Sequence, residues 1–326
     1  MAENNKAGAF EDDKETTNHE TNLATVDFNV ATQVLLKHGL KSTMYKGDFF
    51  PNFWPRTHFE PGQQIVDLDW KDWFESFKDF KAREDDVIVS SYPKSGHHWM
   101  NEVVYMLQHG TTESANISKG RNFIEVKTME ELESMPSPRL LLTHLKYEHI
   151  PKDMLSKGCK MFYMYRNPKD VAVSYFYHII ALESLYDYTG GWNEYFDIML
   201  KEQHEYGRWL DSVPYWLEKS KGIPEILVFS YENLKKDFIN TAKKLSAHIG
   251  KTYTDEFFEN LAEACSIDTM KKNDSLDFAR LKSGKPLIRK GQVGNWKNYF
   301  TVAQNEQFNT LYNPIIDKLD FEVQFE

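Results

Sequence analysis

The sequence contains few cysteines. Only Cys159 and Cys265 occur among its 326 residues. Two thiols are too few for a disulfide framework or for a zinc site built from cysteines. We therefore expect both to be reduced thiols in a reducing compartment.

Long hydrophobic runs are also missing. No run approaches the roughly 18 apolar residues that a membrane-spanning helix requires. The N-terminal residues do not combine a basic segment with an apolar one, as a secretion signal does. These features predict a cytoplasmic protein that does not enter a membrane.

An excess of positive charge is absent as well. The chain has 49 acidic and 39 basic residues and a formal net charge of −10. This balance disfavours a protein that binds nucleic acid or that binds a membrane surface through basic residues. The charge is unevenly distributed, however. Residues 1–30 supply −5 of the total, whereas residues 280–297 contain six basic residues and no acidic one.

The chain is predicted to comprise a disordered acidic tail, residues 1–25, and a single domain, residues 26–326. The tail is polar and poor in hydrophobic residues, which favours disorder. The chain is 41% hydrophobic, which is enough for a sizeable core. No internal repeat or low-complexity linker divides it. Aromatic residues and prolines are mixed at residues 49–55, where we expect a loop.

Short apolar runs alternate with helical patterns from Asp85 onward. The predicted strands are residues 87–91, 140–142, 161–165 and 225–229, and the predicted helices are residues 100–107, 168–182, 232–249 and 254–264. Such alternation is typical of an α/β fold with a central parallel β-sheet flanked by helices. In such a fold the ligand binds beyond the C-terminal ends of the strands.

Residues 91–99, Ser-Tyr-Pro-Lys-Ser-Gly-His-His-Trp, lie between the first of these strands and its helix. A glycine-containing turn at a helix N-terminus presents free backbone N–H groups that suit a phosphate. Lys94 would add a positive charge and Ser95 a hydroxyl donor. The lysine precedes the glycine, so the strict nucleotide-triphosphate loop is absent. Spacing alone leaves an ordinary strand-to-helix turn as an equal alternative.

Two further segments are candidates for anion binding. Arg166 follows another predicted strand, and Ser174 lies two helical turns beyond it. Residues 280–297 combine their basic residues with three glycines, whose backbone can approach a ligand closely. A solvated basic face is the alternative interpretation of this last segment.

His144 follows the apolar residues 140–142, which places it near the C-terminal end of a strand. A histidine there is a candidate general base, because the pKa of imidazole lies near neutrality. A structural role remains the alternative. No acidic or cysteine residue is spaced to complete a metal site with the histidines, so we expect no bound metal.

The sequence resembles the cytosolic sulfotransferases, which transfer a sulfuryl group from 3′-phosphoadenosine 5′-phosphosulfate (PAPS) to the hydroxyl or amine of a small acceptor. The similarity runs from about residue 44 to the C-terminus, in the family's motif order. Residues 92–99 resemble the loop that binds the 5′-phosphosulfate, and residues 166–174 resemble the motif that binds the 3′-phosphate. Residues 289–291 resemble the late loop that closes over the cofactor, and residues 143–145 resemble the segment with the catalytic histidine.

This resemblance implies a P-loop-NTPase-like sulfotransferase fold and a role for each motif residue. His144 would accept the proton of the acceptor, and Lys94 would neutralise charge on the bridging oxygen of the leaving group. The residues implied to bind PAPS are Lys94, Ser95, Gly96, His97, His98 and Trp99 at the 5′ side, Arg166, Ser174, Arg289, Lys290 and Gly291 at the 3′ side, and Trp99 and Tyr231 at the adenine. Homodimer formation is implied by Lys297, Thr301, Val302 and Glu306, which reproduce a short dimer motif of the family.

The chain also departs from the family's usual pattern. His97 and His98 replace two threonines. Imidazoles can donate to the same oxygens but titrate near pH 6.5. We therefore expect cofactor affinity to rise as pH falls, provided that these histidines face the phosphosulfate. Residues 265–267, Cys-Ser-Ile, replace a more usual Thr-Ser-Phe beside the adenine, and Leu142 and Asn295 replace a lysine and an aspartate.

The acceptor is expected to be a small, fairly apolar phenol, steroid or alcohol. The candidate pocket walls are Phe49, Phe50, Phe53, Trp54 and the aromatic segment 175–188. Two other functions stay open. An ATP-dependent nucleotide kinase would keep the fold and would require magnesium. A non-catalytic protein would bind the nucleotide or a hydrophobic ligand without transfer.

Overall fold

The structure is a computed structural model that describes residues 32–35, 41–45, 48–50, 70–114, 122–182, 186, 188–200, 205–273 and 288–326. The predicted acidic tail, residues 1–25, therefore lies outside the described residues. So do two of the candidate pocket aromatics, Phe53 and Trp54, and the first part of the basic segment, residues 280–287.

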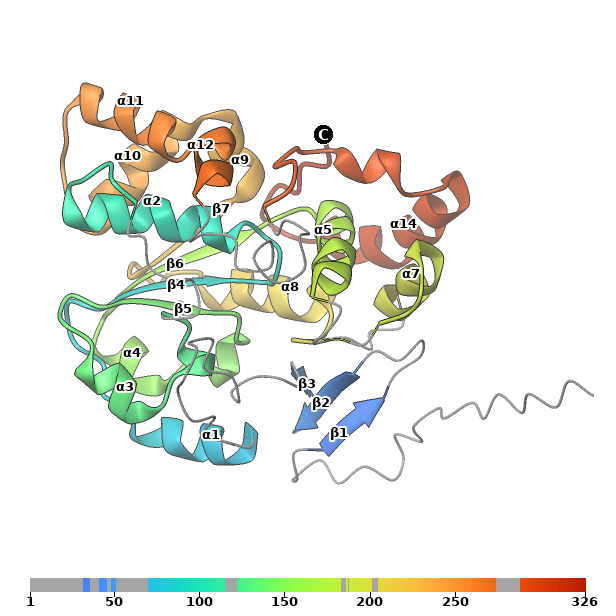
Figure 1. Cartoon of the computed structure of the whole chain (residues 1–326), viewed down its shortest axis with the longest axis horizontal. Helices are drawn as coiled ribbons and strands as arrows, with labels where there is room; N and C mark the ends of the chain where they lie inside the picture. Colours follow the sequence, from blue (N-terminus) through green and yellow to red (C-terminus); the bar gives the residue numbers. More distant parts are fainter. Residues whose placement is uncertain are drawn as a thin grey trace, which may run out of the picture.

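Four parallel strands form the central sheet (Figure 1). They are β4 (Val87–Ser91), β5 (Leu140–Thr143), β6 (Lys160–Tyr165) and β7 (Ile226–Ser230). Their order is β5-β4-β6-β7, and each neighbouring pair is parallel. All four C-terminal ends therefore meet at one edge of the sheet. The predicted α/β fold with a central parallel sheet is confirmed.

Successive side chains of each strand enter two different core layers. On β4, Ile88 joins one hydrophobic cluster, whereas Val87 and Val89 join a second cluster on the other face. The same alternation places Tyr163 of β6 in the first cluster and Phe162 in the second. Because both faces of the sheet are covered, the strands are nearly continuous apolar runs.

Helices cover both faces (Figure 1). The second cluster packs under α2 (His97–His109), α9 (Tyr231–Lys236), α10 (Phe238–His248) and α11 (Asp255–Ala264). The first cluster packs against α5 (Pro168–Ala181), α7 (Trp192–Leu200), α8 (Trp209–Lys219) and α14 (Val302–Ile316). The predicted helices at residues 100–107, 168–182, 232–249 and 254–264 are confirmed, although the third is divided into α9 and α10.

The shorter elements lie around this framework (Figure 1). The helices are α1 (Trp70–Ser76), α3 (Met129–Ser134), α4 (Lys152–Ser156) and α12 (Ile267–Lys272), with single 3₁₀ turns at Phe77–Asp79, Ile124–Val126, Tyr147–His149 and Asn295–Asn298. A separate antiparallel sheet consists of β1 (Thr32–Leu35), β2 (Lys41–Tyr45) and β3 (Asp48–Phe50). The loop expected at residues 49–55 is therefore wrong for Phe49 and Phe50, because both pair with β2.

A buried ion pair joins the N-terminal ends of two central strands. Asp86 precedes β4 and Arg139 precedes β5, and both side chains are buried. Arg139 donates from Nε to Asp86 Oδ1 at 2.7 Å and also bonds the carbonyl oxygens of Leu132 and Lys81. Every charge of the pair is thus hydrogen-bonded, which offsets the free energy needed to remove it from water.

Candidate active site

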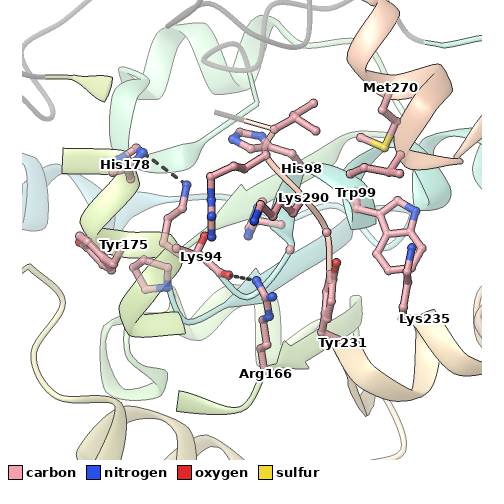
Figure 2. A pocket seen from close by; sticks show the side chains of 18 of the residues that line it. Lys94, His98, Trp99, Arg166, Tyr175, His178, Tyr231, Lys235, Met270 and Lys290 are labelled. Atoms are coloured by element: carbon pink, nitrogen blue, oxygen red, sulfur yellow. Dashed lines mark hydrogen bonds between the residues drawn. The ribbon is translucent and has the colours of Figure 1, made fainter. Parts of the chain in front are cut away.

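A cavity of about 400 Å³ lies at the C-terminal edge of the central sheet (Figure 2). This volume is within the range of small-molecule sites. Each central strand contributes to its wall through the residues that follow it. These are Lys94 after β4, His144 after β5, Arg166 after β6 and Tyr231 after β7. The ligand site expected beyond the strand ends is therefore where the cavity lies.

The structure brings together twelve of the thirteen site residues expected from the sequence. Those that line the cavity are Lys94, Gly96, His97, His98, Trp99, His144, Arg166, Ser174, Tyr231, Arg289, Lys290 and Gly291. The exception is Ser95. Its side chain is fully buried beneath the loop, and its backbone N–H donates to the Tyr92 carbonyl. The hydroxyl of Ser95 therefore lies outside the cavity wall.

The loop before α2 has an unusual backbone conformation. Lys94 has φ +65° and Gly96 has φ +103°, both in the left-handed region. A β-carbon at Gly96 would lie 2.6 Å from Cδ2 of Tyr231, so the loop can approach this ring only because the residue is glycine. Strained backbone of this kind is concentrated at functional sites. The first turn of α2 also borders the cavity, through His97, His98 and Trp99.

His144 is fixed in one tautomer. Its Nδ1 lies 2.8 Å from the Ser91 carbonyl oxygen, and a carbonyl oxygen can only accept, so Nδ1 carries the proton. In the neutral ring, Nε2 then has a free lone pair. Burial, and to a smaller extent the charge of Lys94, lower the pKa of His144 to about 4, although the bond to Ser91 opposes this shift. His144 is therefore a neutral proton acceptor at pH 7.

Glu125 makes hydrogen bonds with the chain segment that carries His144. Its Oε1 accepts the backbone N–H of His144 at 2.6 Å and the hydroxyl of Thr143 at 3.1 Å. Burial raises the pKa of Glu125 to about 7, although both hydrogen bonds oppose this shift. The sequence analysis did not identify Glu125. It lies 19 residues before His144, and no local pattern links the two.

His97 belongs to the inner wall beside His144. Its ring stacks on Phe123 with centroids 4.8 Å apart and meets the edge of His144 at 4.5 Å. Its Nδ1 lies 2.8 Å from the Ser91 hydroxyl. Burial, and then the charge of His144, lower the pKa of His97 well below 6.5. His97 therefore does not titrate near pH 6.5 in the protein without nucleotide, and the expected rise of cofactor affinity at low pH stays a prediction.

Basic side chains form the opposite side of the cavity. Arg166 places its guanidinium 4.3 Å from the centre of the Tyr231 ring and donates to the Gln292 carbonyl oxygen at 3.0 Å. Arg289 lies 4.1 Å above Tyr177 and donates to the hydroxyl of Tyr299. Aromatic faces thus hold both guanidinium planes while leaving other N–H groups for an anion.

A flat aromatic slot adjoins these cations. Trp99 packs against Tyr231 with ring centroids 5.3 Å apart and stacks on Phe238 at 5.9 Å. Ile267 lies so close to Gly291 that a β-carbon there would be 2.9 Å from Ile267 Cδ1. The predicted change from phenylalanine to isoleucine therefore does fall on the wall of this slot. Such a slot suits a planar base.

These residues fit a nucleotide that carries two separate anionic groups. One group would face Lys94 and the first turn of α2, and the other would face Arg166 and Arg289. Several buried nitrogen atoms of the cavity wall, among them Nε of Arg166 and Nε2 of His97, have no hydrogen-bond partner among the described residues. Buried polar atoms are rarely left so, unless a ligand or water satisfies them.

The other half of the cavity is lined by both aromatic and polar side chains. Tyr175 and Tyr186, from the predicted aromatic segment, line it together with Leu182, His178, Glu205 and Tyr206. Glu205 Oε2 accepts the hydroxyls of Tyr175 and Tyr186 at 2.6 and 2.8 Å, and burial raises the pKa of Glu205 to about 7. His178 lies within the predicted aromatic segment 175–188 but was not singled out there, and Glu205 was missed because it lies in no recognisable motif. This half of the cavity is therefore more polar than the aromatic composition of residues 175–188 predicts.

The residues of the expected dimer motif lie away from the cavity. Thr301 caps α14 by accepting the N–H of Gln304, and Lys297 forms an ion pair with Glu326. Val302, the first residue of α14, is 76% exposed. An apolar side chain this exposed is available to a partner.

Two features are absent from the described part of the chain. No group of three or more His, Cys, Asp or Glu side chains is placed there to hold a metal ion. No helix within those same residues has the length and apolar character that a membrane span requires.

Comparisons with known proteins agree on one family. Residues 84–320 match the protein family described as "Sulfotransferase domain". Sulfotransferase 1B1 of Canis lupus familiaris is 36% identical over 272 residues, which cover 77% of this chain and 90% of the relative. Sulfotransferase 1E1 of Homo sapiens is 34% identical over 260 residues, with 75% and 88% covered.

Solved structures show the same relationship. The crystal structure of mouse sulfotransferase SULT7A1 complexed with PAP has a TM-score of 0.69 and 32% sequence identity, and the match covers 86% of this chain and 96% of that one. Retinol dehydratase in a complex with retinol and PAP has a TM-score of 0.72, with 90% and 92% covered. Its identity is 18%, so this likeness bears on the fold alone.

Proposed function

The chain belongs to the sulfotransferase domain family, and we propose from this premise that it transfers a sulfuryl group from PAPS to a small acceptor in the cytoplasm. The mouse relative of known structure was crystallised with PAP, the nucleotide that remains when PAPS loses its sulfuryl group. The observation that carries the proposal is the placement of a neutral, tautomer-fixed His144 in the same cavity as Lys94 and Arg166.

Binding of PAPS would divide between the two anionic ends of the nucleotide. The first turn of α2 would hold the 5′-phosphosulfate through its N–H groups and the positive end of the helix dipole. Arg166 and Arg289, with Lys290, Ser174 and the backbone of Gly291, would hold the 3′-phosphate. Arginine offers forked donors that match a phosphate. A preference for nucleotides with a 3′-phosphate follows from this arrangement.

The adenine would lie against Trp99 and Tyr231, whose rings meet edge to face with centroids 5.3 Å apart. Its planar rings would replace water against the indole and phenol faces. Arg166 already contacts the Tyr231 ring, so this aromatic wall is formed without the nucleotide. A pre-formed site loses less conformational entropy on binding.

PAPS supplies an electrophilic sulfur joined to a phosphate leaving group. His144 would accept the proton of the acceptor hydroxyl at Nε2, while the acceptor oxygen forms its bond to sulfur and the bond from sulfur to the bridging oxygen breaks. Lys94 would neutralise the charge that develops on that oxygen. Ser91 and Glu125 would keep the imidazole oriented throughout, through Nδ1 and the backbone N–H.

The pKa of His144 must rise for this role, because efficient general bases have a pKa near the working pH. The charge of Lys94 is one cause of the low pKa in the free protein. Polyanion binding beside Lys94 would neutralise that charge and add negative potential. The nucleotide would therefore strengthen the base that the reaction needs.

Radiolabelled PAPS tests this function. The native chain is incubated with PAPS labelled in its sulfuryl group and a panel of phenols, steroids, alkyl alcohols and arylamines, with His144→Ala and Lys94→Ala as controls. We expect label to reach at least one acceptor class with the native chain and to be strongly reduced in both variants. Nucleotide binding without any transfer would instead identify a non-catalytic binding protein. Magnesium-dependent transfer from ATP would identify a kinase.

We also propose a homodimer formed through the start of α14. Val302 is exposed there, and its neighbours Lys297, Thr301 and Glu306 supply polar and charged groups around it. An exposed apolar residue surrounded by polar ones is the usual arrangement of a small interface.

A further inference from the structure

His178 makes a direct contact with the lysine expected to act in catalysis. It projects from α5 into the cavity wall, and its Nδ1 lies 3.4 Å from Nζ of Lys94 (Figure 2). This distance is at the long end for a hydrogen bond. A lysine ammonium can only donate, so Nδ1 must accept, and the proton of the neutral ring is then on Nε2.

The surroundings keep His178 neutral. Burial lowers its pKa well below 6.5, and the charges of Lys94 and then His144 lower it further. The rings of Tyr175 and Tyr186 meet the imidazole edge to face at 5.9 and 5.6 Å. Both tyrosines donate to Glu205, so they are oriented as well. His178 can therefore accept a hydrogen bond throughout the neutral pH range.

Lys94 has a particular need for such a partner. Its backbone is held at φ +65°, and Arg166 bonds its carbonyl oxygen at 3.4 Å. The side chain, however, is a flexible four-carbon chain that loses much rotamer freedom when it is fixed. Other cations around the cavity, Arg166, Arg289 and Lys290, repel its ammonium. An uncharged acceptor can fix the ammonium without neutralising it.

We propose that His178 is a positioning residue that holds the Lys94 ammonium inside the cavity, where it can reach the bridging oxygen of the leaving group while His144 faces the acceptor. The inference rests on the proposed sulfuryl transfer, in which these two groups act at opposite ends of one reaction. Positioning of this kind lowers the reorganisation needed to reach the transition state. Chemically, His178 acts through Lys94 and touches neither the leaving group nor the reacting oxygen.

Three variants test this role by sulfuryl transfer. His178→Phe keeps a ring of similar size but removes the acceptor nitrogen, whereas His178→Asn restores an acceptor oxygen close to the position of Nδ1. His248→Asn is the control, because His248 is another histidine that makes a hydrogen bond, in its case with the carbonyl oxygen of Glu225, but does not line the cavity. Each change is also made in a Lys94→Ala background.

We expect His178→Phe to lower kcat about ten-fold, the size of effect produced when a lysine regains its rotamer freedom. The Kd for PAP should change by less than two-fold, and His178→Asn should recover most of the rate. In the Lys94→Ala background, His178→Phe should have no further effect, since residues that act through one another are not additive. An equal ten-fold loss in both backgrounds would overturn the proposal, and so would an asparagine variant as slow as phenylalanine.

A second measurement does not depend on activity or on nucleotide. The ¹⁵N NMR signals of His178 should report a neutral ring protonated at Nε2 in the native chain. In Lys94→Ala the pKa of His178 should rise, because the cation that lowers it is gone. Unchanged His178 signals in Lys94→Ala would refute the contact even if transfer occurs. A native chain that transfers no label but shows the expected signals would reject the proposed function alone.

Discussion

Gly96→Ala should both destabilise the protein and weaken its nucleotide site. Gly96 has φ +103°, a conformation that residues with a β-carbon rarely adopt. The new methyl group would also lie 2.6 Å from Cδ2 and 3.0 Å from Cε2 of Tyr231, a ring that is only 5% exposed. The substitution thus combines backbone strain with a steric clash.

The two contributions can be separated by a matched glycine. Gly222 has φ +74°, and a β-carbon there would meet nothing within 4 Å, so Gly222→Ala carries the backbone strain alone, about 1–2 kcal/mol. The clash at Gly96 adds an overpacking energy of about 1–3 kcal/mol. We therefore expect Gly96→Ala to lower the free energy of unfolding by about 3 kcal/mol and Gly222→Ala by about 1 kcal/mol.

Urea denaturation measures both free energies of unfolding, and calorimetry measures PAP binding. Displacement of Tyr231 would also disturb Arg166, which lies 4.3 Å from its ring. We expect the Kd for PAP to rise about ten-fold or more in Gly96→Ala, which corresponds to about 1.4 kcal/mol, and to stay unchanged in Gly222→Ala. If the two variants lost equal stability and bound PAP equally well, the contact between Gly96 and Tyr231 would not contribute to stability or to nucleotide binding.

Three further predictions concern stability and assembly. Arg139→Met should lower the free energy of unfolding by about 3–5 kcal/mol, because it leaves the Asp86 carboxylate buried without its partner; a loss below 1 kcal/mol in urea would contradict this. Glu205→Gln should match native stability near pH 5 and exceed it by up to about 3 kcal/mol at pH 8. Burial raises the pKa of Glu205 in the folded protein to about 7. The native protein therefore loses stability relative to Glu205→Gln as the pH rises from the unfolded-state pKa through 7. Parallel pH profiles of stability for the two proteins would refute this prediction. Val302→Asp should leave folding intact and convert the proposed homodimer to a monomer in sedimentation, because it places a charge on an exposed apolar contact. A dimer of unchanged strength would show that the interface lies elsewhere.

Much of the fold could be predicted because the central strands are buried on both faces. Residues 87–89 and 161–165 are continuous apolar runs for that reason, and their lengths distinguish them from helices. The strand at Phe49 and Phe50 was missed. Its neighbouring prolines indicate a loop, and only pairing with β2 reveals the strand. Local sequence patterns therefore predict which segments are buried, but they do not identify the distant residues that a segment contacts.

The same distinction between local patterns and distant contacts holds for the residues of the candidate site. Lys94, His144 and Arg166 could be located from sequence, because each follows a strand that ends at the same edge of the sheet. Glu125 and His178 could not, since their roles depend on contacts across 19 and 84 residues. The pKa values of His97 and His144 were likewise out of reach, because burial is their main cause.

The central claim is that His144 serves as the base for sulfuryl transfer from PAPS. The most direct measurement is the single-turnover rate of label transfer from saturating PAPS by His144→Gln, compared with the native chain. A general base contributes about 10²–10⁴-fold to a rate, so we predict a loss of that size with an unchanged Kd for PAP. Transfer within ten-fold of the native rate would contradict the account.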